Sequence, residues 1–212
     1  CSCSTEKARE VLVRQARIPP RYAHCTVAGF ELWNSGDPGL AVARNRTREF
    51  INCYPAVERG LLLMGKVGTG KTHLAVAALR ELVETKGAQG LYVNFLELVQ
   101  ALQMSFEGGG GSRDDILTPV VEAELLVLDE LGAGKPTEWV RDLLYFVINS
   151  RYMSKRVSIF TSNYLDNPQL TRSRQTTRAA SKEGVEPPAP ERWIETLADR
   201  IGDRLRSRLA EM

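Results

Sequence analysis

Short apolar runs alternate with helical stretches along most of the chain. Four runs rich in Leu, Val, Ile and Phe have the length of buried strands. They cover 59–64, 91–95, 124–129 and 157–161. Between them, apolar side chains recur every three or four residues, and the helices that this period predicts cover 74–86, 96–104, 114–122 and 137–153. Alternating strands and helices form parallel βαβ units, so we expect an α/β fold with a central parallel sheet and helices on both faces.

The two ends of the chain carry further helical patterns. Residues 4–17 are polar and charged and predict a helix that the prolines after it end. Near the other end, apolar residues from Ile194 to Leu209 are spaced three or four apart and predict one last helix. Between 171 and 190 the chain is rich in Ser, Thr, Arg, Pro and Gly, which is typical of a mobile surface loop.

Composition limits the class of protein without deciding it. The 212 residues are 43% hydrophobic and 25% charged, as in a folded globular protein, which excludes a wholly disordered chain. Lys and Arg number 28 against 26 Asp and Glu, and this net charge of +2 does not by itself indicate a nucleic-acid binder. No apolar run approaches the roughly 20 residues of a membrane span. Because the chain starts at Cys1 without a signal-like stretch, we expect part of a longer cytoplasmic protein.

A glycine-rich turn between the first predicted strand and its helix carries the clearest chemistry. Its residues match G-x-x-x-x-G-K-[ST], and they are Gly65, Lys66, Val67, Gly68, Thr69, Gly70, Lys71 and Thr72. In such a turn, backbone N–H groups and the helix N-terminus point at phosphate oxygens. Lys71 would reach the β- and γ-phosphates, and the Thr72 hydroxyl would ligate Mg²⁺. His73 follows on the helix and is counted with the nucleotide-binding residues, although we expect it to be structural.

Two other predicted strands end in polar residues. Asp129 and Glu130 follow the aliphatic run at 125–128, and Asn163 follows the strand at 157–161. Strand C-termini of a parallel sheet face the ligand crevice, so Asp129 would lie at the Mg²⁺ site and Glu130 would activate the attacking water. An acidic solvated turn and an ordinary turn asparagine are the simpler interpretations of these residues. The phosphate loop upstream favours the catalytic one.

Arginines share one face of the last predicted helix. Arg200, Arg204 and Arg208 recur every four residues, beside the apolar stripe. A solvated charged face explains them, because Asp199 and Asp203 lie nearby. The alternative is a guanidinium that reaches the γ-phosphate held by a neighbouring subunit, where it would stabilise the transition state.

Together these motifs resemble the AAA+ ATPase domain of bacterial helicase loaders of the DnaC/DnaI type, a P-loop NTPase. The resemblance covers about 14–164 and 193–212 and is carried by RIPPRY, GKVGTGKTHLA, ELLVLDELG, EWVRDLLYFVINSRY, IFTSN and DRIGDRLRSRLAEM. It implies that Asp129 and Glu130 form the Walker B pair after the Walker A loop, and that Asn163 is sensor 1. Arg208 would be the arginine that reaches the adjacent subunit, with Arg204 as second choice.

The resemblance also implies a function. Such proteins use ATP and Mg²⁺, in a homo-oligomer, to place a DnaB-type replicative helicase on single-stranded DNA, and hydrolysis would be slow in isolated subunits. Two alternatives stay open. Transposition helper ATPases of the IstB type share this core but act on duplex DNA with a transposase. A nucleotide-gated adaptor would bind its partner in the ATP state and hydrolyse only to reset.

The resemblance divides the chain into two parts. Residues 1–20 would be a linker and the remnant of a preceding domain, and 21–212 the ATPase domain. Cys1 and Cys3 are similar to the end of a zinc site in some relatives, but two more ligands would be needed, so we expect no zinc here. Many relatives have a last core strand after the final helix, which this chain would lack.

Overall fold

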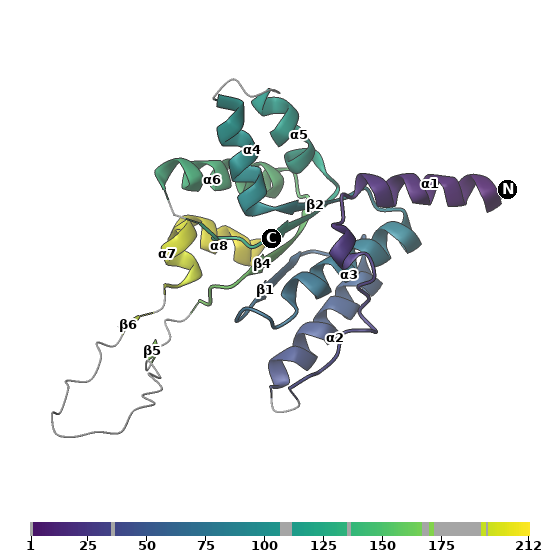
Figure 1. Ribbon diagram of the computed structural model, residues 1–212, viewed down its shortest axis with the longest axis horizontal. Coiled ribbons are helices and arrows are strands. Elements are labelled where there is room, and N and C mark those ends of the chain that lie inside the picture. Colours follow the sequence, from purple (N-terminus) through teal and green to yellow (C-terminus); the bar gives the residue numbers. More distant parts are fainter. Residues whose placement is uncertain are drawn as a thin grey trace, which may run out of the picture.

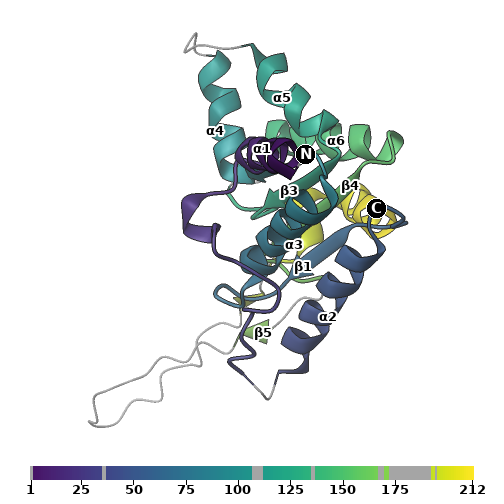
Figure 2. The ribbon, with the colours of Figure 1, turned by 90° about the vertical axis from the view of Figure 1, so that its right-hand side faces the viewer.

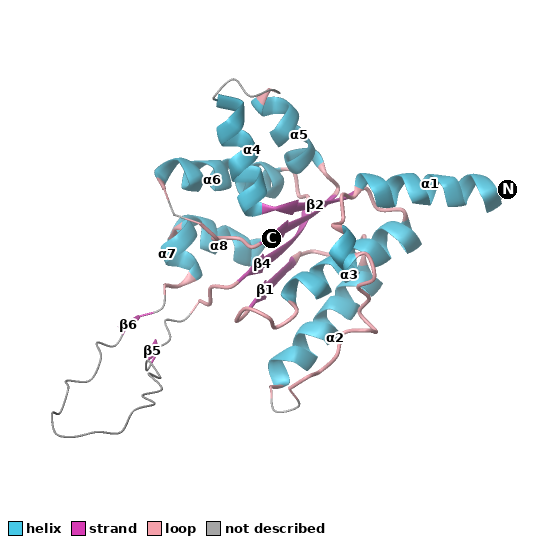
Figure 3. Cartoon of the chain, viewed as in Figure 1, coloured by secondary structure: helices cyan, strands magenta, loops and turns pink. Residues whose placement is uncertain are grey.

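A four-stranded parallel sheet forms the centre of the fold (Figure 3). The computed structural model describes residues 2–34, 37–106, 112–134, 137–166, 170–171, 192–193 and 195–212. The strands are β1 (Leu61–Met64), β2 (Gly90–Asn94), β3 (Leu125–Asp129) and β4 (Val157–Ser162). Their spatial order is β1-β4-β3-β2, and each neighbouring pair is parallel. All four strands predicted from the apolar runs are confirmed.

Helices cover both faces of this sheet, as the βαβ pattern predicts (Figure 1). One face carries α1 (Ser2–Gln15), the 3-10 turn η1 (Pro20–Tyr22), α2 (Pro38–Cys53) and α3 (Lys71–Lys86). The other carries α4 (Phe95–Phe106), α5 (Arg113–Glu122), α6 (Glu138–Met153), α7 (Leu197–Ile201) and α8 (Asp203–Glu211). Each face has its own apolar core, and α3 lies against the sheet along its whole buried side (Figure 2).

The sheet has two edge strands. Among the described residues, β1 pairs with β4 alone, so its outer edge has no strand beside it. At the other edge, the Tyr92 N–H of β2 donates to the carbonyl of Ala16 at 2.8 Å. Ala16 lies just after α1 and is fully buried, so the end of the N-terminal helix is hydrogen-bonded to the sheet.

Two elements differ from the predicted pattern. The sequence analysis did not predict α2, although Asp37 caps it by accepting from the Gly39 N–H and Pro38 starts it. The last helix was predicted as one unit, but Gly202, with φ of +91°, separates α7 from α8. A capping box between Thr196 and Asp199 starts α7.

The predicted loop at 171–190 falls almost wholly outside the described residues. Thr171 is described: with Leu170 it forms β5 (Leu170–Thr171), which pairs antiparallel with β6 (Arg192–Trp193). Cys1 also lies outside the described residues. Within the described part of the chain, no helix is both long and apolar enough to cross a bilayer.

Candidate functional site

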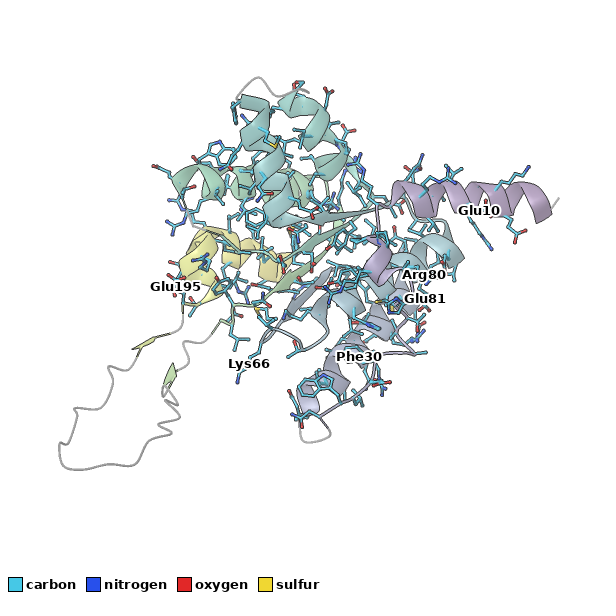
Figure 4. The ribbon with its side chains drawn as sticks, in the orientation of Figure 1. Glu10, Phe30, Lys66, Arg80, Glu81 and Glu195 are labelled. Carbon is cyan, nitrogen blue, oxygen red and sulfur yellow. The ribbon has the colours of Figure 1, made fainter. Side chains whose placement is uncertain are left out.

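The glycine-rich turn joins the end of β1 to the start of α3, as predicted. Gly70 is the N-cap of α3 and has a φ of +84°, in the left-handed region that favours glycine. A Cβ at this position would lie 2.5 Å from the Phe30 ring. The Phe30 ring is buried against the turn (Figure 4). The N-terminal segment therefore packs directly against the turn through Phe30, and only glycine fits at position 70.

The side chain of Lys71 reaches back into the turn that precedes it. Its Nζ donates to the carbonyl of Gly65 at 2.9 Å and to that of Lys66 at 2.8 Å. Burial lowers the pKa of Lys71, while the negative charges of Asp129 and Glu130 act in the opposite direction. In contrast, the Lys66 side chain is exposed and points away from the body of the protein (Figure 4). Of these two lysines, Lys71 thus has the position of the phosphate-binding one.

Asp129 is the most heavily hydrogen-bonded carboxylate of the site. It ends β3, is 3% exposed, and accepts from hydroxyls of three elements. Thr72 of α3 donates to Oδ1 at 2.9 Å, and Thr161 of β4 donates to the same oxygen at 2.5 Å. Tyr92 of β2 donates to Oδ2 at 2.8 Å. Burial raises the pKa of Tyr92, and the charge of Asp129 raises it further, so the phenol keeps its proton.

Glu130, the residue after Asp129, has a strained backbone conformation. Its φ is +61°, which is uncommon for a residue with a side chain. The backbone is held there because the Glu130 N–H donates to Thr161 Oγ1 at 2.9 Å and the Leu131 N–H to the Thr161 carbonyl at 2.8 Å. Its Oε2 accepts from Asn94 Nδ2 at 3.2 Å. Strain at a polar residue beside a phosphate-type turn is typical of functional sites.

Asn94 was not among the residues predicted from the sequence. It ends β2, and its Oδ1 also accepts from the N–H of Leu96, 2.9 Å away, at the start of α4. The sequence contains the pattern that identifies it, because Asn94 comes at the end of an apolar run, as Asp129 and Asn163 do.

Asn163 lies at the same C-terminal end of the parallel strands as Asp129 and Glu130. β4 runs between β1 and β3, so its C-terminal end lies between that of β1, which the phosphate loop follows, and that of β3, where Asp129 lies. The preceding residue, Ser162, accepts from the Gly65 N–H at 3.2 Å. The Asn163 side chain is exposed. The sensor 1 role that the resemblance implies for Asn163 stays a prediction.

The three arginines of the last helical segment have different surroundings. Arg200 donates to the Gly132 carbonyl at 2.9 Å, pairs with Glu195 and stacks on the Tyr164 ring. Arg208 donates to Asn149 of α6 and lies over two tyrosine rings of the same helix. Arg204 is exposed and has no hydrogen-bond or ion-pair partner within the described part of the chain.

His73 faces the N-terminal segment. Its Nε2 lies 2.9 Å from the Thr26 carbonyl, and its ring packs edge-on against Phe30. These contacts agree with the structural role expected for it.

A cavity of about 770 Å³ opens beside the turn. Its walls are the turn itself, β1, the first half of α2 and the Trp33 side chain. A volume of this size accommodates a nucleoside. The cavity thus lies where the base and sugar of a nucleotide would extend from phosphates bound at the turn.

The donor set fits a hard cation. Thr72 Oγ1 and the Asp129 carboxylate are oxygen ligands in contact with each other, and oxygen is what Mg²⁺ prefers. These residues would hold Mg²⁺, which would neutralise charge on the β- and γ-phosphates. Lys71 would add positive charge, and Glu130 is the carboxylate placed to accept a proton from water. The arrangement suits transfer of a terminal phosphoryl group to water.

Comparisons with known proteins agree with this chemistry. The replicative helicase loader DnaC of Escherichia coli K12 is 26% identical over 146 residues, which are 69% of this chain and 58% of that protein. The loader DnaI of Bacillus subtilis is 28% identical over 160 residues, 74% of this chain and half of that protein. The chain thus spans about half to three fifths of the length of these relatives.

A solved structure shares most of the fold. The crystal structure of the DnaC helicase loader superimposes with a TM-score of 0.69 and 28% identity, over 92% of this chain and 96% of that one. This likeness identifies the sheet and its helices as those of an AAA+ P-loop NTPase. The family model described as "IstB-like ATP binding protein" matches residues 4–167, more than half of the chain. The chain therefore belongs to the IstB-like ATP-binding protein family.

Proposed function

We propose that this chain is the ATPase part of a replicative helicase loader. It would bind ATP with Mg²⁺ at the turn of 65–72, assemble with copies of itself in the ATP state, and place a DnaB-type helicase on single-stranded DNA. The observation that carries the proposal is the hydrogen-bonded group of Thr72, Asp129, Thr161 and Glu130 beside Lys71. It stands in a chain whose fold is similar to that of the DnaC structure over 92% of this chain.

Each side chain has one task in this scheme. Backbone N–H groups of the turn and Lys71 hold the phosphates, while Thr72 and Asp129 hold Mg²⁺. Glu130 accepts the proton of the attacking water, and Asn163 orients that water. A guanidinium from the adjacent subunit stabilises the charge that develops on the γ-phosphate. Arg204 is the better donor for that task, because the guanidinium of Arg208 already binds Asn149 and two tyrosine rings.

Hydrolysis measured against protein concentration tests the shared site. Turnover per subunit is expected to rise steeply with concentration and to increase when single-stranded DNA is added. Glu130→Gln should keep ATP binding and lose turnover by about a hundredfold or more, because the general base is removed. Lys71→Ala should lose binding itself. Turnover that is independent of concentration and survives in Glu130→Gln would contradict the proposal.

Transposition helper activity is the second candidate, favoured by the family model, which is described as IstB-like. Binding to single-stranded and to duplex DNA of equal length separates the two. A loader should prefer the single strand in the presence of ATP, whereas preference for the duplex would favour the helper. A nucleotide-gated adaptor is a third outcome: Glu130→Gln with ATP would then bind the helicase as the unchanged protein does, and turnover would not affect loading.

A further inference from the structure

A tyrosine on a neighbouring strand holds the carboxylate proposed to bind the metal. Tyr92 and Asp129 lie on adjacent parallel strands, where Tyr92 pairs with Val127 and Asp129 is two residues further along β3. Side chains on this diagonal share one face of the sheet and are within reach of an aromatic residue. The Tyr92 hydroxyl spans it and donates to Asp129 Oδ2 at 2.8 Å.

The three hydroxyls around Asp129 differ in what else they do. Thr72 is itself a proposed metal ligand, so its hydroxyl is needed elsewhere when the metal binds. Thr161 also accepts from the Glu130 N–H, so it supports the backbone of the next residue. Tyr92 is 7% exposed, and its hydroxyl donates its one proton to the Asp129 carboxylate. Its hydroxyl is therefore the donor best placed to fix the orientation of Asp129 independently of the metal.

We propose that Tyr92 is a positioning residue for the metal site, which fixes the Asp129 carboxylate by donating to Oδ2. The proposal rests on the proposed function, because it presumes that Asp129 binds Mg²⁺. Partners that orient a metal ligand typically change metal affinity about tenfold or more when removed. Loss of the Tyr92 hydroxyl should therefore weaken the contribution of Mg²⁺ to nucleotide binding and leave the contribution of the phosphate loop intact.

The sheet offers a matched control at the opposite end of β3. Tyr54 is 5% exposed, and its hydroxyl donates to the carboxylate of Glu124, the residue before β3. Tyr54→Phe and Tyr92→Phe therefore remove the same kind of hydrogen bond from the two ends of one strand. Only the second removal touches the proposed metal ligand.

The experiment measures affinity for a fluorescent ADP analogue in EDTA and in Mg²⁺, and the ratio of the two reports the effect of the metal. Tyr92→Phe should lower this ratio about tenfold with the affinity in EDTA unchanged, and Tyr54→Phe should leave the ratio unchanged. An unaltered ratio in Tyr92→Phe would overturn the inference. Loss of affinity in EDTA as well would mean that Tyr92 only supports the fold, which also overturns it. An unmodified protein that binds no nucleotide would instead refute the proposed function.

Discussion

Arginines on α6 and α8 have opposite surroundings. Arg151 of α6 is fully buried and donates to five oxygens: Ser158 Oγ and the carbonyls of Val120, Val121, Ala123 and Val157. Burial lowers the pKa of Arg151 to about 9, and the charge of Arg156 contributes to the shift, so its charge persists at neutral pH. Arg204 of α8 is exposed, and no described residue accepts from it.

The contrast separates a structural guanidinium from one that is available to a ligand. Arg151 joins the end of α5 to the start of β4, and all three nitrogens of its guanidinium donate to backbone carbonyls or to Ser158. An arginine in this state has nothing left to offer a phosphate. No described residue accepts from Arg204, so its donors are available to a phosphate. Residue type and helical spacing do not distinguish Arg151 from Arg204, whereas the hydrogen-bond acceptors around each guanidinium do.

The largest effect is expected at Arg204. Arg204→Ala should reduce the ATPase activity of the assembled protein by about a thousandfold, because a guanidinium supplied in trans contributes that much or more. Arg208→Ala, one turn later on α8, is the matched control and should reduce it far less. ATP turnover at a saturating protein concentration is the measurement.

Mixing the proteins sharpens this prediction. A subunit that carries Arg204→Ala still has its own Glu130, so adding it to Glu130→Gln subunits should restore part of the turnover. An inactive Arg208→Ala protein would contradict the prediction. The functional guanidinium would then be the one that already contacts Asn149 and two tyrosine rings.

Arg151→Met should lower the free energy of unfolding by about 3 kcal/mol, because buried carbonyls lose their charged donor. Arg156→Ala is the control: this half-buried arginine donates to one carbonyl of the same helix end, that of Glu122. Its loss should cost under about 1 kcal/mol. Urea unfolding gives both values, and the folded Arg151→Met protein should bind nucleotide normally. Equal stability of the two variants would contradict a structural role for Arg151.

The smallest effect is expected at Arg206, whose guanidinium forms two hydrogen bonds with Asp166. These bonds hold the pKa of Asp166 below its usual value, so the pair stabilises the fold above that value and loses its effect as the pH falls through the lowered pKa. Asp166→Asn should cost under about 1 kcal/mol at neutral pH, since the carboxylate is partly exposed and screened.

Thermal unfolding at neutral and at acidic pH checks this prediction, because the difference between Asp166→Asn and the unmodified protein should vanish in acid. Glu49→Gln, from the exposed pair with Arg46, should have no measurable effect at either pH. A difference at Asp166 that grows in acid would contradict the assignment.

Much of the fold could be predicted because its strands are short runs rich in apolar residues. β3 is buried at every position, and no other local structure suits such a run followed by an acidic pair. α2 was missed since its buried positions, Leu40, Thr47, Phe50 and Ile51, are interrupted by arginines and include a threonine. The break at Gly202 was missed because the apolar spacing continues across it.

The site could be predicted where one local motif defines it. The turn of 65–72 and Asp129 with Glu130 lie together as expected, because strand ends of a parallel sheet meet at one edge. Tyr92 could not be recognised, since its contact with Asp129 depends on the register between β2 and β3. The surroundings of the arginines depend likewise on how α8 packs against α6.

The backbone at Glu130 has an evolutionary consequence. A side chain in the left-handed conformation costs on the order of 1 kcal/mol, and glycine would remove this cost together with the carboxylate. Under the proposed function, selection for hydrolysis would keep glutamate at a position where the backbone prefers another residue. In lineages that keep the nucleotide but abandon its hydrolysis, this position should drift first, toward glycine or asparagine, while the turn of 65–72 persists.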